Sequence, residues 1–291
     1  MPISTLTSVD ARSRIGTEPE FRLVLPSRPE NVAIVRQALG GAIDVLDLSE
    51  SRLLDINAAV SEACNNVVVH AYGEQEGPLR VSLCISDDEL EVIVTDEGIG
   101  IRPRHPDPDE ELQGLGLSLI QTLSDRVEFL GGIGEGTTVR MAFALDGILD
   151  ELWTGDLTAE DGDFDPPPGE LSVSVSAGAL AAPVLGRVIA MLASRAGFSL
   201  EGVSEAQLVT DSLAAHVPRV LVGSRIMLGI DRPQGELIVR VGPLQREGAE
   251  KILAASALGD LPPLLERLTK ERRVEGSASG ELLSLTLVNP S

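Results

Sequence analysis

One short segment pairs two side chains that could carry acid–base and metal chemistry. Glu62 and Asn66 lie four residues apart in SEACNNVVVHAY, residues 61–72, so both project from one face of a helix. A carboxylate can accept the proton of an attacking hydroxyl group, and a carboxamide oxygen can bind Mg²⁺. Taken alone, the pair also fits a solvated glutamate beside an exposed asparagine.

A second segment could form a pocket for a flat ligand. It reads TDEGIGI, residues 95–101, and follows an expected strand that ends at Asp96. Gly98 and Gly100 allow the backbone to approach a ligand closely or to adopt a positive φ. An ordinary turn is the alternative interpretation of this segment.

Two further glycine-containing segments could complete such a site. QGLGLSLIQ, residues 113–121, opens a helix, and its glycines leave backbone N–H groups free at the N-terminus, where the helix dipole favours anions. This pattern favours a phosphate-binding loop, although a flexible helix start would have the same sequence. GEGTTV, residues 134–139, is a turn into a strand that places Thr137 and Thr138 near the other loops.

These segments must be positioned by alternating strands and helices. Apolar periodicity predicts strands at 21–25, 79–85, 89–95, 126–130 and 137–145, and helices at 29–46, 51–71 and 115–124. Residues 101–112 contain three prolines and many charges, which indicates a mobile loop. The pattern predicts an α/β fold, a two-layer sandwich with helices on one face of a mixed, mostly antiparallel sheet.

The order and spacing of the four segments closely resemble the nucleotide site of the GHKL ATPase superfamily, which has the Bergerat fold. SEA-x-x-N and DEGIGI resemble the anti-sigma factor serine/threonine kinase branch of that superfamily. The resemblance covers about residues 20–145. It implies that Glu62 is the general base, that Asn66 binds Mg²⁺ and that Asp96 bonds to the adenine amino group.

The same resemblance implies the rest of the ATP site. Residues 101–112 would be the ATP lid, the helix start would line the triphosphate and Thr137 would support the adenine end. The implied nucleotide-binding residues are Asn66, Asp96, Gly98, Gly100, Gly114, Leu115, Gly116, Leu117 and Thr137.

The implied function is that of an ATP-dependent anti-sigma factor. It would have serine/threonine protein kinase activity toward an anti-anti-sigma protein of the STAS type, with ATP and Mg²⁺. Two alternatives stay open: a nucleotide-gated regulator that binds its partner without phosphorylating it, and a histidine-kinase-like ATPase subunit. A gyrase-type ATPase is disfavoured because Lys251 and Lys270 are the only lysines, and neither lies in a motif for the γ-phosphate.

Charge divides the 291 residues into three parts. Residues 18–145 are expected to form the ATP-binding domain and 171–291 a second domain, joined by a proline-rich linker, 146–170, with nine acidic and no basic side chains. A formal net charge of −22 excludes a general basic surface for nucleic acid or for an anionic membrane. Without a signal peptide or a long apolar run, we expect a cytoplasmic protein.

The second domain is expected to be a degenerate copy of the first. LSVSV at residue 171 resembles FRLVL at 21, and similar strand and helix segments follow in the same order. In this comparison Asp211 lies near the position of the base and Ala215 four residues on, while Pro243 takes the place of Asp96. The copy would therefore lack a nucleotide site. We expect either an intramolecular pseudo-dimer of the two domains or a homodimer.

Overall fold

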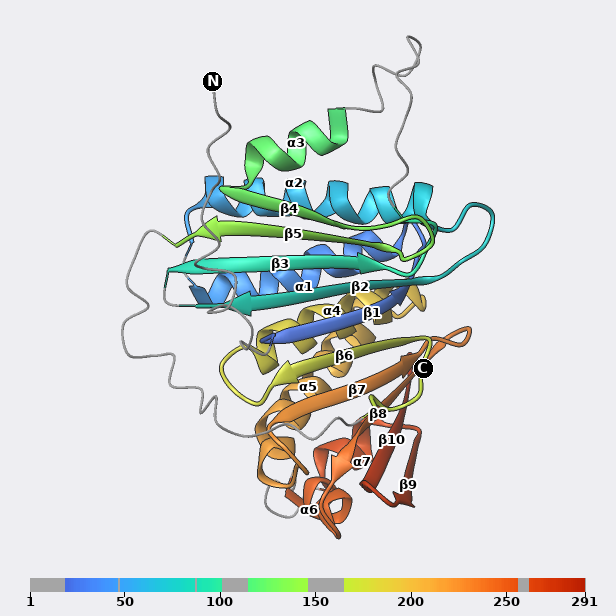
Figure 1. Ribbon diagram of the computed structural model, residues 1–291. Coiled ribbons are helices and arrows are strands. Elements are labelled where there is room, and N and C mark those ends of the chain that lie inside the picture. Colours follow the sequence, from blue (N-terminus) through green and yellow to red (C-terminus); the bar gives the residue numbers. More distant parts are fainter. Residues whose placement is uncertain are drawn as a thin grey trace, which may run out of the picture.

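The computed structural model describes residues 19–46, 48–86, 88–100, 115–145, 165–255 and 262–290. Two consecutive sets of elements follow one another in it (Figure 1). The first set consists of β1 (Phe21–Pro26), α1 (Asn31–Leu46), α2 (Glu50–Asn66), the π-helical turn η1 (Val67–Ala71), β2 (Pro78–Ile85), β3 (Glu89–Asp96), α3 (Leu115–Leu123), β4 (Arg126–Gly131) and β5 (Thr137–Ala144).

The second set repeats this order with one additional helix. It consists of β6 (Leu171–Ser176), α4 (Ala181–Arg195), α5 (Leu200–His216), the 3-10 turn η3 (Val217–Arg219), β7 (Arg225–Asp231), β8 (Glu236–Leu244), α6 (Gly248–Ala255), α7 (Leu264–Leu268), β9 (Glu271–Ser277) and β10 (Gly280–Val288). We call residues 19–145 the first half and residues 165–290 the second half.

All ten strands belong to one sheet in the order β4-β5-β3-β2-β1-β6-β7-β8-β10-β9, and every neighbouring pair is antiparallel. The strand order of the second half, read outward from β6, therefore matches that of the first half, read outward from β1. Leu23, the third residue of β1, pairs with Val173, the third residue of β6. Equivalent residues face each other there, so an approximate twofold axis passes between them. The expected sandwich and its duplication are confirmed.

Alternation along the strands decides which face of the sheet is covered. In β2 the side chains of Leu79, Val81, Leu83 and Ile85 are buried, while those between them are partly exposed. The buried side chains face the helical layer, which lies along one face of the sheet (Figure 1). With few aromatic residues in the chain, leucine, valine, isoleucine and alanine fill this core.

Helices α1 and α4 cross closely behind the central strands. A Cβ atom on Gly41 would lie 2.5 Å from the carbonyl oxygen of Pro183, so only glycine fits this contact. Next to it, Arg187 of α4 forms an ion pair with Asp44 of α1. The two halves are thus joined by helix packing as well as by the β1–β6 ladder.

Two expectations need correction. The predicted helix 51–71 ends as an α-helix at Asn66 and continues as the π-helical turn η1. The predicted linker is not free at its end, because Pro167 is buried and its carbonyl oxygen would lie 2.2 Å from a Cβ on Gly229. The N–H of Glu170 also donates to Asp231 Oδ1 at 2.7 Å. Composition alone did not indicate that a glycine in β7 leaves room for this backbone.

The rest of the predicted linker, 146–164, and the predicted lid, 101–112, lie outside the described residues. Within the described part of the chain, no helix is both long enough and apolar enough to cross a membrane.

The α1–α4 crossing gives a test of the joint between the halves. Gly41→Ala places a Cβ against a backbone carbonyl, which we expect to lower the free energy of unfolding by about 1–3 kcal/mol. Gly186→Ala is the matched control, because a Cβ on this α4 residue would meet nothing within 4 Å and alanine favours a helix by about 1 kcal/mol. Urea unfolding measures both variants, and equal stabilities would contradict the close crossing.

Candidate functional site

Helix α2 fixes the direction of Glu62 and Asn66. It begins after Ser49, whose side chain accepts a hydrogen bond from the N–H of Arg52 at 3.3 Å and so caps the helix. Its apolar face is buried, while Glu62 and Asn66 are only partly buried on the adjoining side. Packing of this helix therefore leaves the carboxylate and the carboxamide at the edge of the core, where a ligand can reach them.

Asn66 has an unsatisfied polar atom. Its Nδ2 is buried and has no hydrogen-bond partner among the described residues. A buried amide without a partner is costly, and rotation of the side chain exchanges its nitrogen and oxygen. The carboxamide is thus free to contact a bound group, which fits the role of a Mg²⁺ or nucleotide ligand. The π-helical turn η1 begins directly after Asn66, and such turns are often found at functional sites.

Glu62 lies against the start of α3. A Cβ atom on Gly116 would stand 2.1 Å from Glu62 Oε1, so the absence of a side chain there makes room for the carboxylate. The structure thus brings the predicted base together with one of the predicted phosphate glycines. Leu117 is 47% exposed on the outer side of α3. Leu115 is the first residue of this helix, and Gly114 lies outside the described residues.

Asp96 closes the other end of the site, at the end of β3. Its side chain is 4% exposed, and its Oδ1 accepts a hydrogen bond from the N–H of Gly98 at 2.8 Å. A Cβ on Gly98 would lie 2.1 Å from the carbonyl oxygen of Ala71, and the N–H of Ile99 donates to that same oxygen at 2.9 Å. The turn after β3 therefore rests on the end of the helix that carries Asn66.

The glycine turn before β5 packs against this same segment. Gly100 has a φ of 72°, and a Cβ there would lie 1.9 Å from the carbonyl oxygen of Gly132. Gly136 has a φ of 74°, and a Cβ there would lie 2.2 Å from the carbonyl oxygen of Asp96. Thr137 follows directly and begins β5, half-buried. Tertiary packing thus brings Asp96, Gly98, Gly100 and Thr137 together.

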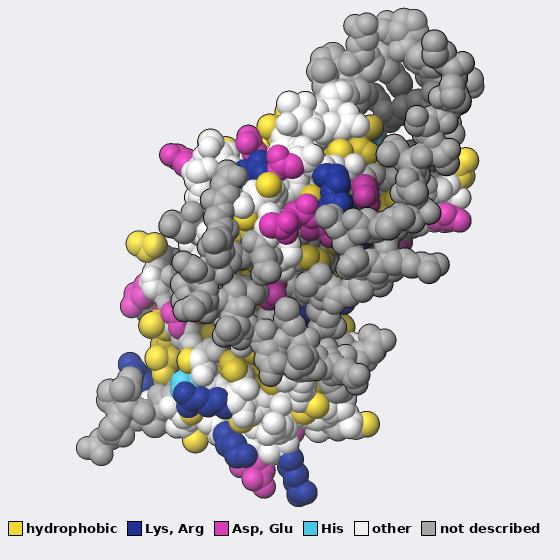
Figure 2. Space-filling view, turned by 60° about the vertical axis from the view of Figure 1, so that its left-hand side comes forward, with side chains coloured by type: hydrophobic (Ala, Val, Ile, Leu, Met, Phe, Trp, Pro, Cys, Tyr) yellow, Lys and Arg dark blue, Asp and Glu magenta, His cyan; other side chains and the backbone are white. Residues whose placement is uncertain are grey.

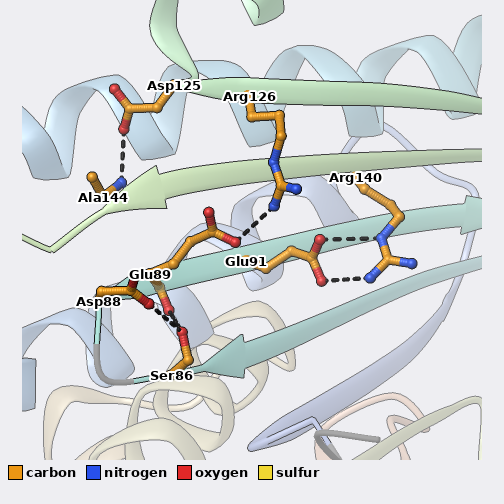
Figure 3. A network of polar contacts seen from close by, with 8 residues as sticks. All are labelled: Ser86, Asp88, Glu89, Glu91, Asp125, Arg126, Arg140 and Ala144. Carbon is orange, nitrogen blue, oxygen red and sulfur yellow. Dashed lines mark hydrogen bonds and ion pairs between the residues drawn. The ribbon is translucent and has the colours of Figure 1, made fainter. Parts of the chain in front are cut away.

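Two arginines on the free face of the first half form ion pairs with glutamates. Arg140 makes two hydrogen bonds to Glu91, at 3.1 and 2.8 Å, and Arg126 contacts Glu89 at 2.7 Å (Figure 3). The bonds to Glu91 raise the pKa of Arg140. Figure 2 accordingly shows dark blue beside magenta over the upper, N-terminal part of the molecule. The charges of Arg126 and Arg140 are thus compensated by neighbouring carboxylates.

The contacts of Figure 3 join the ends of four neighbouring strands, β2, β3, β4 and β5. Asp125 accepts a hydrogen bond from the N–H of Ala144 at 2.7 Å, and the side chain of Ser86 donates to the carbonyl oxygen of Glu89 at 3.1 Å. Among the described residues, no group of three or more histidine, cysteine, aspartate or glutamate side chains could hold a metal ion.

The second half has different residues at these positions. Ser49 and Ser199 cap α2 and α5, and the two helices have the same length, so Ser212 and His216 occupy the places of Glu62 and Asn66. The sequence comparison, which gave Asp211 and Ala215, was one residue out of register. His216 Nδ1 lies 2.7 Å from the carbonyl oxygen of Ser212, so its ring is turned onto its own helix.

The second half also differs from the first at the end of β8. Strand register confirms Pro243 in the place of Asp96, because Val81–Val94 and Leu228–Val241 are equivalent pairs. In place of the lid, helix α6 begins at Gly248. At the start of β10, the Glu281 carboxylate accepts hydrogen bonds from the N–H groups of Glu247, at 2.7 Å, and Ala249, at 3.2 Å.

Comparisons with known proteins agree with this geometry. Residues 25–143 match the sequence model of the histidine kinase-like ATPase domain. Over 122 residues the chain is 39% identical to the anti-sigma F factor of Pasteuria penetrans. This match covers 38% of this chain and 81% of that protein. Over 140 residues the chain is 35% identical to the serine-protein kinase RsbW of Bacillus subtilis (strain 168). This match covers 44% of this chain and 86% of that protein.

The fold and these similarities define the first half as a histidine kinase-like ATPase domain. The chain belongs to the family of anti-sigma factors and RsbW-type serine-protein kinases through this N-terminal part. The description of this domain implies ATP as the nucleotide. Among solved structures, the RsbU and RsbW domains of Rv1364c from Mycobacterium tuberculosis align with 43% of this chain and 31% of that chain, at 23% identity and a TM-score of 0.35.

The Glu281 contact predicts a pH dependence. The N–H groups of Glu247 and Ala249 lower the pKa of the Glu281 carboxyl below its ordinary value, so the ionised form stabilises the fold. This stabilisation is present above the ordinary pKa and is lost as the pH falls through the lowered one. Glu281→Gln should therefore lower the midpoint of thermal unfolding at pH 7, with the difference from wild type closing on acidification.

Scanning calorimetry across this pH range checks the expectation. Glu275→Gln, on the exposed surface of β9, is the control and should stay close to wild type throughout. A Glu281→Gln difference that is constant with pH would contradict the assignment.

Proposed function

We propose that this protein is an ATP-dependent anti-sigma factor that phosphorylates a serine or threonine of an anti-anti-sigma protein of the STAS type. The observation that carries the proposal is the meeting of Glu62 with Gly116, beside an Asn66 carboxamide that has a buried atom without a partner. Similarity to anti-sigma factors and serine-protein kinases supports it.

In this proposal Glu62 accepts the proton of the attacking hydroxyl group. The hydroxyl oxygen forms the new bond to the γ-phosphorus while the bond from that phosphorus to the leaving oxygen of ADP breaks. The proton of the hydroxyl group passes to the Glu62 carboxylate. Asn66 holds Mg²⁺, which supplies positive charge at the phosphates when bound. Backbone N–H groups around Gly116, at the start of α3, orient the phosphates.

The other end of the site would bind the base. Asp96 accepts a hydrogen bond from the adenine amino group, and its partner Gly98 keeps the carboxylate aimed because it donates to Oδ1 at 2.8 Å. Gly100 and Thr137 lie on the segments that pack around this end. In this proposal the end of β3 recognises the base, while α2 and α3 act on the phosphates.

We further propose that the second half takes the place of a second ATP-binding domain. It pairs along β1 through β6 and packs α4 on α1, while its own site positions carry Ser212, His216 and Pro243. One chain would then form a pseudo-dimer with a single nucleotide site. The Gly41 and Gly186 variants test the contact on which this arrangement depends. The acidic chain fits a basic partner surface.

Asn66→Ala tests the metal and nucleotide assignment. We expect it to reduce ATP affinity about tenfold or more in the presence of Mg²⁺, because it removes a ligand of a charged group. It should have little effect when Mg²⁺ is chelated. Titration calorimetry measures this, with Asn65→Ala, an exposed neighbour on the same helix, as the matched control. An equal effect with and without Mg²⁺ would refute the role of Asn66 as a metal ligand.

Glu62→Gln separates a kinase from a binding switch. A general base contributes about a hundredfold or more, so transfer of labelled phosphate to the anti-anti-sigma protein should fall by that factor while ATP binding persists. Phosphoamino-acid analysis of the wild-type product should give phosphoserine or phosphothreonine. Transfer that survives the substitution contradicts the role of Glu62. Absence of transfer by the wild type, with ATP-dependent partner binding, would favour the regulator without kinase activity.

A further inference from the structure

A tyrosine outside the predicted site residues bridges two strands beside Asp96. Tyr72 directly follows η1, and its hydroxyl oxygen accepts a hydrogen bond from the N–H of Glu97 at 2.7 Å. The same hydroxyl donates to the carbonyl oxygen of Pro78, also at 2.7 Å. One phenol group thus contacts both β2 and the residue that follows β3.

Strand register shows what this bridge replaces. Leu79 pairs with Asp96 at the end of the β2–β3 ladder, so Pro78 and Glu97 are the next opposed residues. The Tyr72 hydroxyl stands between their backbone groups, in the place where a direct backbone hydrogen bond would continue the ladder. The strands therefore separate directly after Asp96, and the chain turns toward η1.

The ring of Tyr72 is held in one place. A Cβ atom on Gly77 would lie 2.1 Å from its Cε1, so only glycine leaves room for it. Gly77 is in turn fixed by Ser27, whose N–H donates to the Gly77 carbonyl at 2.9 Å and whose side chain accepts from the Gly77 N–H at 3.1 Å. Burial raises the pKa of the phenol, so the hydroxyl keeps the proton that it donates to Pro78.

In the second half the corresponding backbone segments meet without a bridging tyrosine. Val222 follows His216 at the spacing by which Tyr72 follows Asn66, and its N–H donates to the carbonyl oxygen of Pro243 at 3.1 Å. Leu221 and Leu244 form a backbone bridge there. The second half thus has other residues in the places of Asn66, Asp96 and Tyr72, and there the two backbone segments bond to each other directly.

We propose that Tyr72 is a positioning residue that sets Asp96 relative to the helix of Asn66 and thereby determines the preference for adenine over guanine. This inference rests on the proposed function. Adenine presents an amino donor to a carboxylate, whereas guanine presents a carbonyl oxygen at the corresponding atom, which the carboxylate repels. Discrimination then depends on how firmly Asp96 is held, and Tyr72 links its neighbour Glu97 to β2.

Tyr72→Phe in the full chain tests the proposal. It removes both hydrogen bonds and keeps the ring. Titration calorimetry with Mg–ATP and Mg–GTP should show ATP affinity reduced about three- to tenfold, and the ATP-to-GTP affinity ratio reduced by a similar factor. Inorganic tripolyphosphate with Mg²⁺, used as a competitor of ATP, should keep its affinity, because the α2–α3 end of the site is unchanged.

Ser86→Ala is the matched control, because it removes a hydroxyl that donates to the carbonyl oxygen of Glu89 at the opposite end of the β2–β3 pair, away from Tyr72 and Glu97. It should retain the wild-type nucleotide ratio. Gly77→Ala is a second variant, which displaces the ring without removing the hydroxyl, and it should lower the ratio as Tyr72→Phe does.

The outcomes separate this inference from the proposed function. Equal loss of ATP and GTP affinity, or an unchanged ratio, would overturn the role of Tyr72 while leaving the ATP site in place. Unfolding of both the Tyr72 and the Gly77 variants would assign Tyr72 to stability alone and also overturn it. A wild-type chain that binds no ATP would overturn the proposed function and this inference together.

Discussion

The backbone ladder between β1 and β6 is the constraint on which the rest of the molecule depends. Each half would otherwise end in an exposed strand edge, with a row of unpaired N–H and C=O groups. Pairing Leu23 against Val173 joins the halves into one sheet and places α1 on α4 behind it. With the inner edges closed in this way, β4 and β9 are the outer strands of the sheet that the described residues form.

Two copies of one fold have diverged most where β3 and β8 leave the sheet. In the first half the chain turns after Asp96, and glycines let backbone segments pack so closely that a Cβ atom would clash with a neighbouring carbonyl oxygen. In the second half a helix follows, and Glu281 satisfies the N–H groups at its start. Similar backbones therefore carry different contacts where these strands end, because in the second half a glutamate accepts hydrogen bonds from the backbone N–H groups at the start of a helix.

Charge explains how an acidic domain could bind a polyanion. No lysine occurs before residue 146, and arginines on the free face of the sheet pair with glutamates. Those pairs stabilise the strand ends and withdraw positive charge from ligands. In the proposed function, the N-terminus of α3, the Asn66 carboxamide and a divalent cation supply phosphate affinity among the described residues.

The sequence by itself determined the elements, the candidate site residues and the family resemblance, because periodicity and glycine spacing are local properties. It also indicated the duplication, although the alignment of the two halves was one residue out of register on α5. A repeated pattern does not show at which residue a helix begins, and here the structure shows it through the cap of Ser199. Only the tertiary structure placed Gly116 on Glu62 and the turn of Gly98 on Ala71, and only it joined the halves through β1 and β6. Tyr72 escaped sequence analysis for the same reason: its role depends on two backbone groups from separate strands, which meet only when the chain folds.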